Sequence, residues 1–323
     1  MSELHKFIFD GLPVRGHLVR LTDSWQELLR RRAQAGQTLP LPVRDLLGEM
    51  TVAAVLMQAN IRFNGALILQ VFGDGPVKLA VTEVQGDLAF RSTATLVGAL
   101  AEDCSFAALL NRQGGGRCAI TLDPADRTQG RQPYQGVVAL RDATGTAFAS
   151  LGKVLEHYMR QSEQLETRLV LAANQNVAAG LLIQRLPIEG SNNLGAKTGA
   201  ADGQGDEAFN RIAHLTATLT QNELLGVDAS TLLRRLFWEE PLRRFDPRAL
   251  GRAPRFECRC SRSRVARMLH GLGRSEIDAI LAEQGRVEIG CDFCSLQYRF
   301  DPVDVGELFT PARDQMPPTA AIN

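Results

Sequence analysis

The sequence predicts an α+β protein with a mainly antiparallel sheet core and helices, followed by a helical linker and a small cysteine-rich C-terminal module. Three observations lead to this architecture. Strand-like segments with hairpin signals outnumber helix-like segments before residue 190, a Gly- and Ala-rich stretch begins at that residue, and four of the six cysteines form two close pairs near the C-terminus. A length of 323 residues with 45% hydrophobic content suits about two domains with a real core.

Two helices are expected near the N-terminus. Ser24 and Glu27 have the spacing of a capping box, and apolar residues recur at helical spacing from Val43 to Met57. A third helix is expected at "LGKVLEHYM", where the apolar side chains share one face.

The strands of the core are predicted from apolar segments between turn residues. The segments "GALILQVF" and "VKLAVTEV" flank the sequence "GDGP" at 73–76, a hairpin turn in which glycine supplies the positive φ angle. Further strands are expected at "RCAITLD", "YQGVVAL", "TRLVLAA" and "AAGLLIQRL". Together these elements define an α+β core domain at residues 1–190.

Residues 191–254 are predicted to form a metastable linker with amphipathic helices. The stretch "GSNNLGAKTGAADGQGDE", residues 190–207, is expected to be an unstructured connector because it cannot bury enough apolar surface to offset chain entropy. Two amphipathic helical patterns follow it, and Thr220 with Glu223 forms a further capping box. Short helices are marginal alone, so these need a partner surface.

The last module is predicted at residues 255–312, with a tail at 313–323. It contains both cysteine pairs, and between them Ser275 is expected to cap the short helix "EIDAILAEQG". Gly285 should end that helix, because glycine accepts the left-handed conformation of a C-terminal cap.

The two cysteine pairs supply four thiolates, the tetrahedral ligand set of a structural zinc ion. The predicted metal ligands are Cys258, Cys260, Cys291 and Cys294. A module of about 60 residues gains only about 3 to 5 kcal/mol from its own core, whereas a structural zinc contributes about 10 to 16 kcal/mol. One Zn²⁺ in the reduced state should therefore decide whether the module folds. Two disulfides, an iron–sulfur cluster or unligated thiols are the alternatives, and the Cys-X-Cys spacing departs from that of ordinary zinc ribbons.

The N-terminus has a continuous apolar run only at residues 7–9, far short of a signal-peptide core, and no later run approaches a membrane span. The protein is therefore expected in the cytoplasm, without a membrane partner and with reduced thiols. Cys104 and Cys118 lie in apolar contexts and are expected to be small buried hydrophobes.

The charge pattern bears on two alternative functions. Six arginines around the first cysteine pair suggest a zinc-ribbon nucleic-acid-binding protein, but the seven acids at 275–304 oppose them and the total charge is zero. No aromatic stacking array accompanies the arginines, so nucleic acid is not an expected partner. A thiol oxidoreductase is the other alternative, although "CDFC" lacks a βαβ context. No HExxH or Gly-X-Ser-X-Gly motif is present, and an enzyme is not expected.

The motifs resemble those of a known family, the redox-regulated heat-shock holdases or 33 kDa chaperonin family. The resemblance rests on "ECRCSRSR" with the distant "CDFC", and on "FGDGPVKLAV", "YQGVVAL", "YMRQSEQLETRL" and "ILAEQG" in the same order. It covers nearly the whole chain, and the four-cysteine pattern is its specific part.

The resemblance implies an ATP-independent chaperone that holds unfolding proteins under oxidative stress. It implies an inactive, zinc-bound reduced form, and activation through zinc release and two disulfides, Cys258 with Cys260 and Cys291 with Cys294. The clients would be unfolded or partly unfolded proteins, and the active form would be a homodimer. The connector of this chain is glycine-rich and poorly charged, so no client-binding residues are carried over from the family.

Overall fold

The computed structural model describes residues 1–61, 63–98, 100–101, 103–126, 132–187, 199–245 and 253–310, and of residues 199–205 only the backbone. The chain divides into two compact units, Met1–Glu257 and Cys258–Asn323. The predicted division at residues 190 and 254 falls within the first unit and stays a prediction. The described strands pair antiparallel except for one short parallel pair, so the predicted α+β class is confirmed.

The first unit contains two sheets and seven helices among its described residues. In spatial order, the five-stranded sheet consists of β10 (Leu242–Arg244), β1 (Glu3–Phe9), β2 (Val14–Leu21), β9 (Ala178–Arg185) and β8 (Thr167–Ala173). The six-stranded sheet consists of β11 (Arg255–Phe256), β5 (Ala89–Leu96), β4 (Val77–Gln85), β3 (Gly65–Phe72), β6 (Arg117–Pro124) and β7 (Tyr134–Ala139). The helices are α1 (Asp23–Gln34), α2 (Leu41–Asn60), α3 (Phe106–Leu110), α4 (Leu151–Ser162), α5 (Gly199–Ala217), α6 (Gln221–Gly226) and α7 (Ala229–Leu236).

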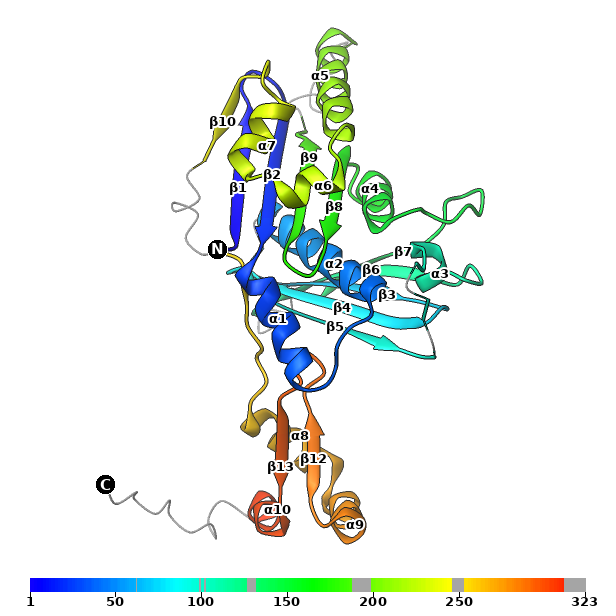
Figure 1. The fold of residues 1–323 in the computed structure, drawn as a ribbon, viewed down its shortest axis with the longest axis vertical. Coiled ribbons are helices and arrows are strands. Elements are labelled where there is room, and N and C mark those ends of the chain that lie inside the picture. The colour runs from blue at the N-terminus through cyan, green and yellow to red at the C-terminus, as the bar shows by residue number, and fades with distance from the viewer. Residues whose placement is uncertain are drawn as a thin grey trace, which may run out of the picture. The chain divides into compact units, whose positions relative to one another are not determined.

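Helix α2 lies between the two sheets (Figure 1). Every residue from Met50 to Ala59 is buried, because all but Gln58 are apolar or small, and Gln58 Nε2 donates a hydrogen bond of 3.3 Å to the Gly65 carbonyl. The predicted strand segments all form strands, including the hairpin β3–β4 around the turn at 73–76. The helical spacing of apolar residues suggested a helix with one apolar face. In the structure, α2 is a central helix that is buried on all sides from Met50 to Ala59.

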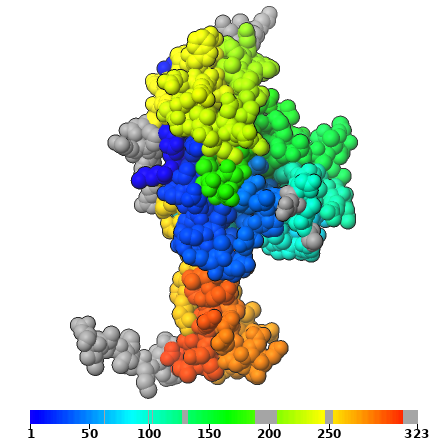
Figure 2. All heavy atoms as spheres, viewed as in Figure 1, coloured from blue at the N-terminus to red at the C-terminus, as the bar shows by residue number. Residues whose placement is uncertain are grey.

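The five-stranded sheet carries apolar side chains on both faces. Successive residues of a strand point to opposite faces, and each face of this sheet packs against a core. One face contributes Leu4, Val19, Leu21 and Leu182 to the core around α2. The other face is covered by α5, α6 and α7, which Figure 2 shows as a yellow-green layer. The fully buried members of this second core include Phe7, Phe9, Val14, Leu18, Leu181 and Ile183 from the sheet and Phe209, Ile212, Leu224, Leu232 and Leu233 from the helices. The predicted linker helices thus find their partner surface on this sheet.

Two predicted helix starts are wrong. Helix α1 begins at Asp23 without a side-chain cap, and the Ser24 hydroxyl instead shares a hydrogen bond of 2.6 Å with Ser2 Oγ. Helix α9 begins one residue before Ser275, and Gly273 precedes it at φ 94°. At Ser24 a contact with the N-terminal strand competes for the hydroxyl, which sequence spacing cannot reveal. The capping box of Thr220 and Glu223 is confirmed.

The predicted unstructured connector is partly wrong. Its residues 190–198 lie outside the described residues, but 199–207 form the first half of α5. The second half of that helix is anchored by buried Phe209 and Ile212, and each residue added to an existing helix gains a hydrogen bond. Packing at one end therefore extends a helix into a sequence with little apolar surface of its own.

The second unit is small. Its elements are α8 (Arg262–Leu272), α9 (Arg274–Gln284), β12 (Val287–Gly290), β13 (Gln297–Phe300) and α10 (Pro302–Phe309). Gly285 ends α9 at φ 75°, as predicted. The core consists of Leu269, Ile277, Val287, Tyr298, Phe300 and Val305. Among the described residues of the whole chain, no helix is long and apolar enough to cross a membrane.

Candidate metal centre

The two cysteine pairs lie on two short segments of the second unit. Cys258 and Cys260 lead into α8, whose first turn is capped by the Ser261 side chain. Cys291 and Cys294 lie in the turn that joins β12 to β13. Each pair is therefore positioned by the local structure of its own segment.

The structure brings the four sulfur atoms within 4.8 Å of one another. The Cys258 and Cys291 sulfurs are 3.6 Å apart, and those of Cys260 and Cys294 are 3.4 Å apart. A tetrahedral zinc site with bonds of 2.3 Å has sulfur–sulfur edges of about 3.8 Å. The four thiols could therefore hold one metal ion with only small movements. Among the described residues, no other group of three or more His, Cys, Asp or Glu side chains has this potential.

Hydrogen bonds within the cluster favour thiolate at one sulfur. The Cys258 thiol donates to Cys291, and with the backbone amides of Phe293 and Cys294 it lowers the pKa of Cys291 to about 4. The same shared hydrogen bond and burial raise the pKa of Cys258. Burial raises the pKa of Cys294 to about 11. The turn between β12 and β13 thus directs backbone N–H donors at the Cys291 sulfur, and such donors stabilise the thiolate form in which cysteine binds a metal.

Tyr298 is a member of the site that sequence reasoning missed. Its hydroxyl donates a hydrogen bond of 3.0 Å to the Cys260 sulfur. Tyr298 and Phe300 alternate with exposed residues along β13, so both point into the small core. That alternation, directly after the Cys-X-X-Cys pair, is the signal that could have identified Tyr298.

The arginines of the module make internal contacts. Arg262 lies 4.2 Å above the Phe300 ring and forms an ion pair of 2.7 Å with Asp304. Arg274 pairs with Asp278 at 3.3 Å, one turn along α9. These arginines therefore balance acids of their own unit, as the opposing charge totals of the sequence suggest.

The two remaining cysteines belong to the first unit. Cys118 is fully buried on β6, and burial raises the pKa of its thiol to about 12. Cys104 is partly buried against the core around α2. Their packing agrees with the predicted role as small hydrophobes.

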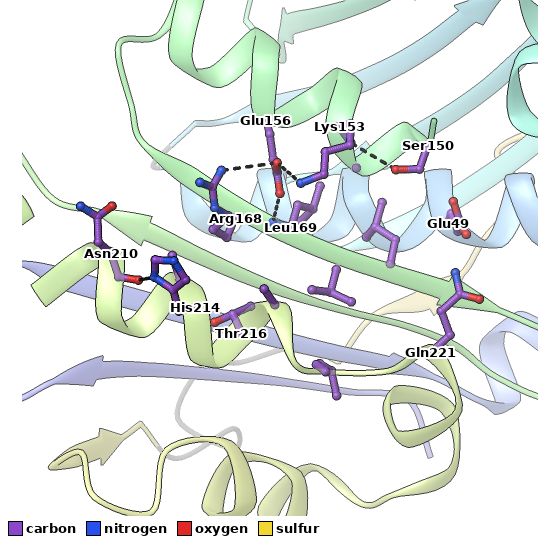
Figure 3. A pocket seen from close by; sticks show the side chains of 16 residues that line it. Glu49, Ser150, Lys153, Glu156, Arg168, Leu169, Asn210, His214, Thr216 and Gln221 are labelled. Carbon is purple, nitrogen blue, oxygen red and sulfur yellow. Dashed lines mark hydrogen bonds and ion pairs between the residues drawn. The ribbon is translucent and has the colours of Figure 1, made fainter. Parts of the chain in front are cut away.

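The first unit contains a cavity of about 540 Å³ between α4, β8 and α5 (Figure 3). Glu156 forms an ion pair of 2.8 Å with Lys153, and it accepts a hydrogen bond from the backbone N–H of Leu169. Glu49 of α2 also lines the cavity, and no hydrogen bond or ion pair involves its carboxyl within the described part of the chain. Burial, with a smaller effect of Asp45, raises the pKa of Glu49 to about 8.

Replacing Glu49 with glutamine should reduce the pH dependence of stability. A raised folded-state pKa means that stability is greatest below the unfolded value of 4.5 and falls as pH rises through about 8. The other ionisable groups that line the cavity are Lys153, Glu156, Arg168 and His214, and the substitution leaves them in place. Urea unfolding of the reduced protein from pH 5 to 9 should show a smaller decline in the Glu49→Gln variant.

The control for that measurement is Glu239→Gln, since Glu239 is exposed. It should follow the wild-type curve. If the free energy of unfolding fell equally with pH in Glu49→Gln and the wild type, the raised pKa of Glu49 would be contradicted.

Comparison with known proteins gives a consistent result. Residues 2–301 match the family model described as Hsp33 protein. The chain is 44% identical over 309 residues to the 33 kDa chaperonin of Chromobacterium violaceum, covering 95% of this chain and 94% of the relative. It is 40% identical over 310 residues to the 33 kDa chaperonin of Methylobacillus flagellatus, covering 96% and 94%.

A solved structure shares the fold. The crystal structure of the 33 kDa chaperonin (heat shock protein 33 homolog) from Thermotoga maritima superposes with a TM-score of 0.72 at 18% identity. The match covers 95% of this chain and 98% of that chain. The resemblance inferred from the sequence motifs is therefore confirmed over nearly the whole chain.

Proposed function

Because the chain belongs to the Hsp33 family, whose curated relatives are named chaperonins, we propose that it is an oxidation-activated chaperone that holds unfolding proteins without ATP. The observation that carries this proposal is the cluster of four thiols in a unit with a very small core. A second observation supports it, namely an apolar sheet face covered by α5 and the two short helices α6 and α7. The protein acts by binding and not as an enzyme, and it acts in the cytoplasm, where thiols are kept reduced.

In the reduced state the four cysteines hold one Zn²⁺. The ligands are Cys258, Cys260, Cys291 and Cys294, whose spacing and thiol chemistry suit zinc. Bound zinc would cross-link the two pairs and keep all four sulfurs as thiolates. Tyr298 holds the Cys260 sulfur in place through its hydroxyl.

Oxidation by a peroxide removes these ligands. Each pair of thiolates loses two electrons and forms one disulfide, while one hydrogen peroxide molecule takes up these two electrons and two protons from solvent and is reduced to two water molecules. The disulfides join Cys258 to Cys260 and Cys291 to Cys294. The module then lacks the cross-link that holds its two segments together, and it unfolds.

The client surface is the sheet face beneath α5, α6 and α7. These helices bury Phe209, Ile212 and Leu233 against it. Their release would expose a contiguous apolar surface, which is what an unfolding protein binds. In this active state the chain is a homodimer. Nucleic acid is not a partner, because Arg262 and Arg274 are engaged within the module.

The proposal is tested by comparing reduced and peroxide-treated protein. The reduced form should contain one zinc per chain and leave an aggregating client unprotected, whereas the oxidised form should lose zinc and suppress aggregation without nucleotide. An oxidised sample that prevents no aggregation defeats the proposal. Salt-sensitive RNA binding by the reduced form would instead favour the nucleic-acid alternative.

The two disulfides should form in a fixed order. A bond across Cys-X-Cys closes a smaller and more strained ring than one across Cys-X-X-Cys, so Cys291 and Cys294 should pair first. The expected intermediate has lost its zinc and retains free thiols at Cys258 and Cys260. Timed quenching with a thiol alkylator and peptide mapping would identify it.

That mapping also distinguishes other pairings. Sulfur–sulfur distances of 3.6 Å and 3.4 Å join Cys258 to Cys291 and Cys260 to Cys294. Peptides linked in this way, or early capture of a Cys258–Cys260 bond, would contradict the proposed order.

A further inference from the structure

Three basic side chains converge at one end of the five-stranded sheet. Lys6 on β1 is the register partner of His17 on β2, and Arg15 lies two residues from His17 on the same strand. Because side chains alternate along a strand, all three lie on the face toward α2. Val19 and Leu21 continue the same face into the apolar core. The basic cluster is therefore the polar end of an otherwise apolar layer.

The hydrogen-bond partners of these cations are all neutral. The Lys6 ammonium donates to the Ala59 carbonyl at the end of α2. Arg15 Nη2 donates to Gln184 Oε1 at 2.6 Å, and that oxygen also accepts from Asn60 Nδ2 at 2.8 Å. Among the described residues, no carboxylate forms an ion pair with Lys6, Arg15 or His17. Half-buried cations of folded proteins are normally paired with an opposite charge.

Polar atoms of the cluster remain without partners. The imidazole of His17 is 5% exposed, and its Nδ1 atom makes no hydrogen bond. Arg15 Nε and Asn60 Oδ1 are also buried and unpartnered. A buried donor without a partner costs free energy, so Arg15 Nε and His17 Nδ1 in one place indicate a missing acceptor, whereas Asn60 Oδ1 is itself an acceptor.

The electrostatics of the cluster point the same way. Burial, then Lys6 and Arg15, lowers the pKa of His17 to about 3. Burial also lowers the pKa of Lys6, with a further effect from Arg15. The cations therefore repel one another, and a bound anion would relieve this repulsion. Lys6, Arg15 and Asn60 are only partly buried, so parts of these side chains reach solvent, while Arg15 Nε and His17 Nδ1 lie beneath the surface.

We propose that Lys6, Arg15 and His17 form a binding site for a phosphate-type oxyanion. Arg15 offers Nε and its η nitrogens as a planar fork, Lys6 supplies a point charge, and neutral His17 donates from Nδ1 in one tautomer. The two permanent charges match those of a phosphate dianion. The anion comes either from free phosphate or from a phosphate chain such as tripolyphosphate.

The test uses full-length reduced protein at constant ionic strength. Calorimetric titration with inorganic phosphate should give saturable binding to one site, and phosphate should shift the ring signals of His17 in NMR spectra. Arg15→Met and Lys6→Met should each weaken binding about tenfold or more, since each removes a charged donor. Tripolyphosphate binding more tightly than phosphate identifies the chain as the ligand, and equal affinities identify free phosphate.

The matched control is Arg243→Met, because Arg243 is an exposed arginine on β10 of the same sheet. It should bind phosphate as the wild type does. Absence of saturable binding to the wild type, an unmoved His17 signal, or an equal loss in the control would each overturn the proposal. The NMR measurement on the wild type keeps the test valid if a variant fails to fold. None of these measurements depends on chaperone activity.

Discussion

Replacing Cys291 with serine should abolish metal binding by the reduced protein and unfold residues 258–310. Among the described residues of the second unit, 258–310, the core consists of six buried side chains. Such a core supplies about 3 to 5 kcal/mol, whereas structural zinc supplies about 10 to 16 kcal/mol. Metal content by elemental analysis and hydrogen exchange by peptide should report both losses in one sample.

The matched control for this experiment is Cys104→Ser. Cys104 is a partly buried free thiol of the first unit, so its replacement removes one thiol without touching the cluster. This variant should keep one metal ion and normal protection of 258–310. If the Cys291→Ser variant retains that protection without metal, the core of the module suffices and the proposed switch has no structural basis.

The grouping of the four cysteines could be predicted because each pair is local in the sequence. Cys-X-X-Cys fits a hairpin turn, and Cys-X-Cys precedes a capped helix. The close contact of Cys258 with Cys291 could not be predicted, because it depends on how the two segments meet. The alternation along β13 could have placed Tyr298 in the core, but its hydrogen bond to Cys260 could not be predicted, since Cys260 lies on the other segment.

The first two strands were also beyond sequence reasoning. Lys6, Arg15 and His17 interrupt the apolar alternation of β1 and β2 with polar residues on the core-facing side. Strand β1 pairs with β10, whose Leu242 lies at the far end of the first unit in sequence. Pairings over such separations are set by tertiary packing and leave little local signal.

If the proposed function is right, replacing Phe237 with alanine should activate the reduced protein without oxidant. Phe237 is 2% exposed, and its ring lies edge-on to that of Phe9 with centroids 5.0 Å apart. Truncating a buried phenylalanine costs about 3 to 5 kcal/mol, and here the loss falls on the contact between α7 and the sheet. Hydrophobic-dye binding and suppression of client aggregation should both rise to values near those of the oxidised wild type.

The neighbouring Trp238 is the matched control, because it is 75% exposed and its replacement by alanine removes a larger side chain from solvent. Trp238→Ala should stay inactive when reduced. The Phe237→Ala variant must keep its zinc and the exchange protection of β8 and β9, so that activity is traced to the helices and not to general unfolding. Faster exchange in α5, α6 and α7 with no gain in chaperone activity would show that the face beneath them is not the client surface. The chaperone activity of the oxidised wild type would then have to come from a surface in a different part of the chain.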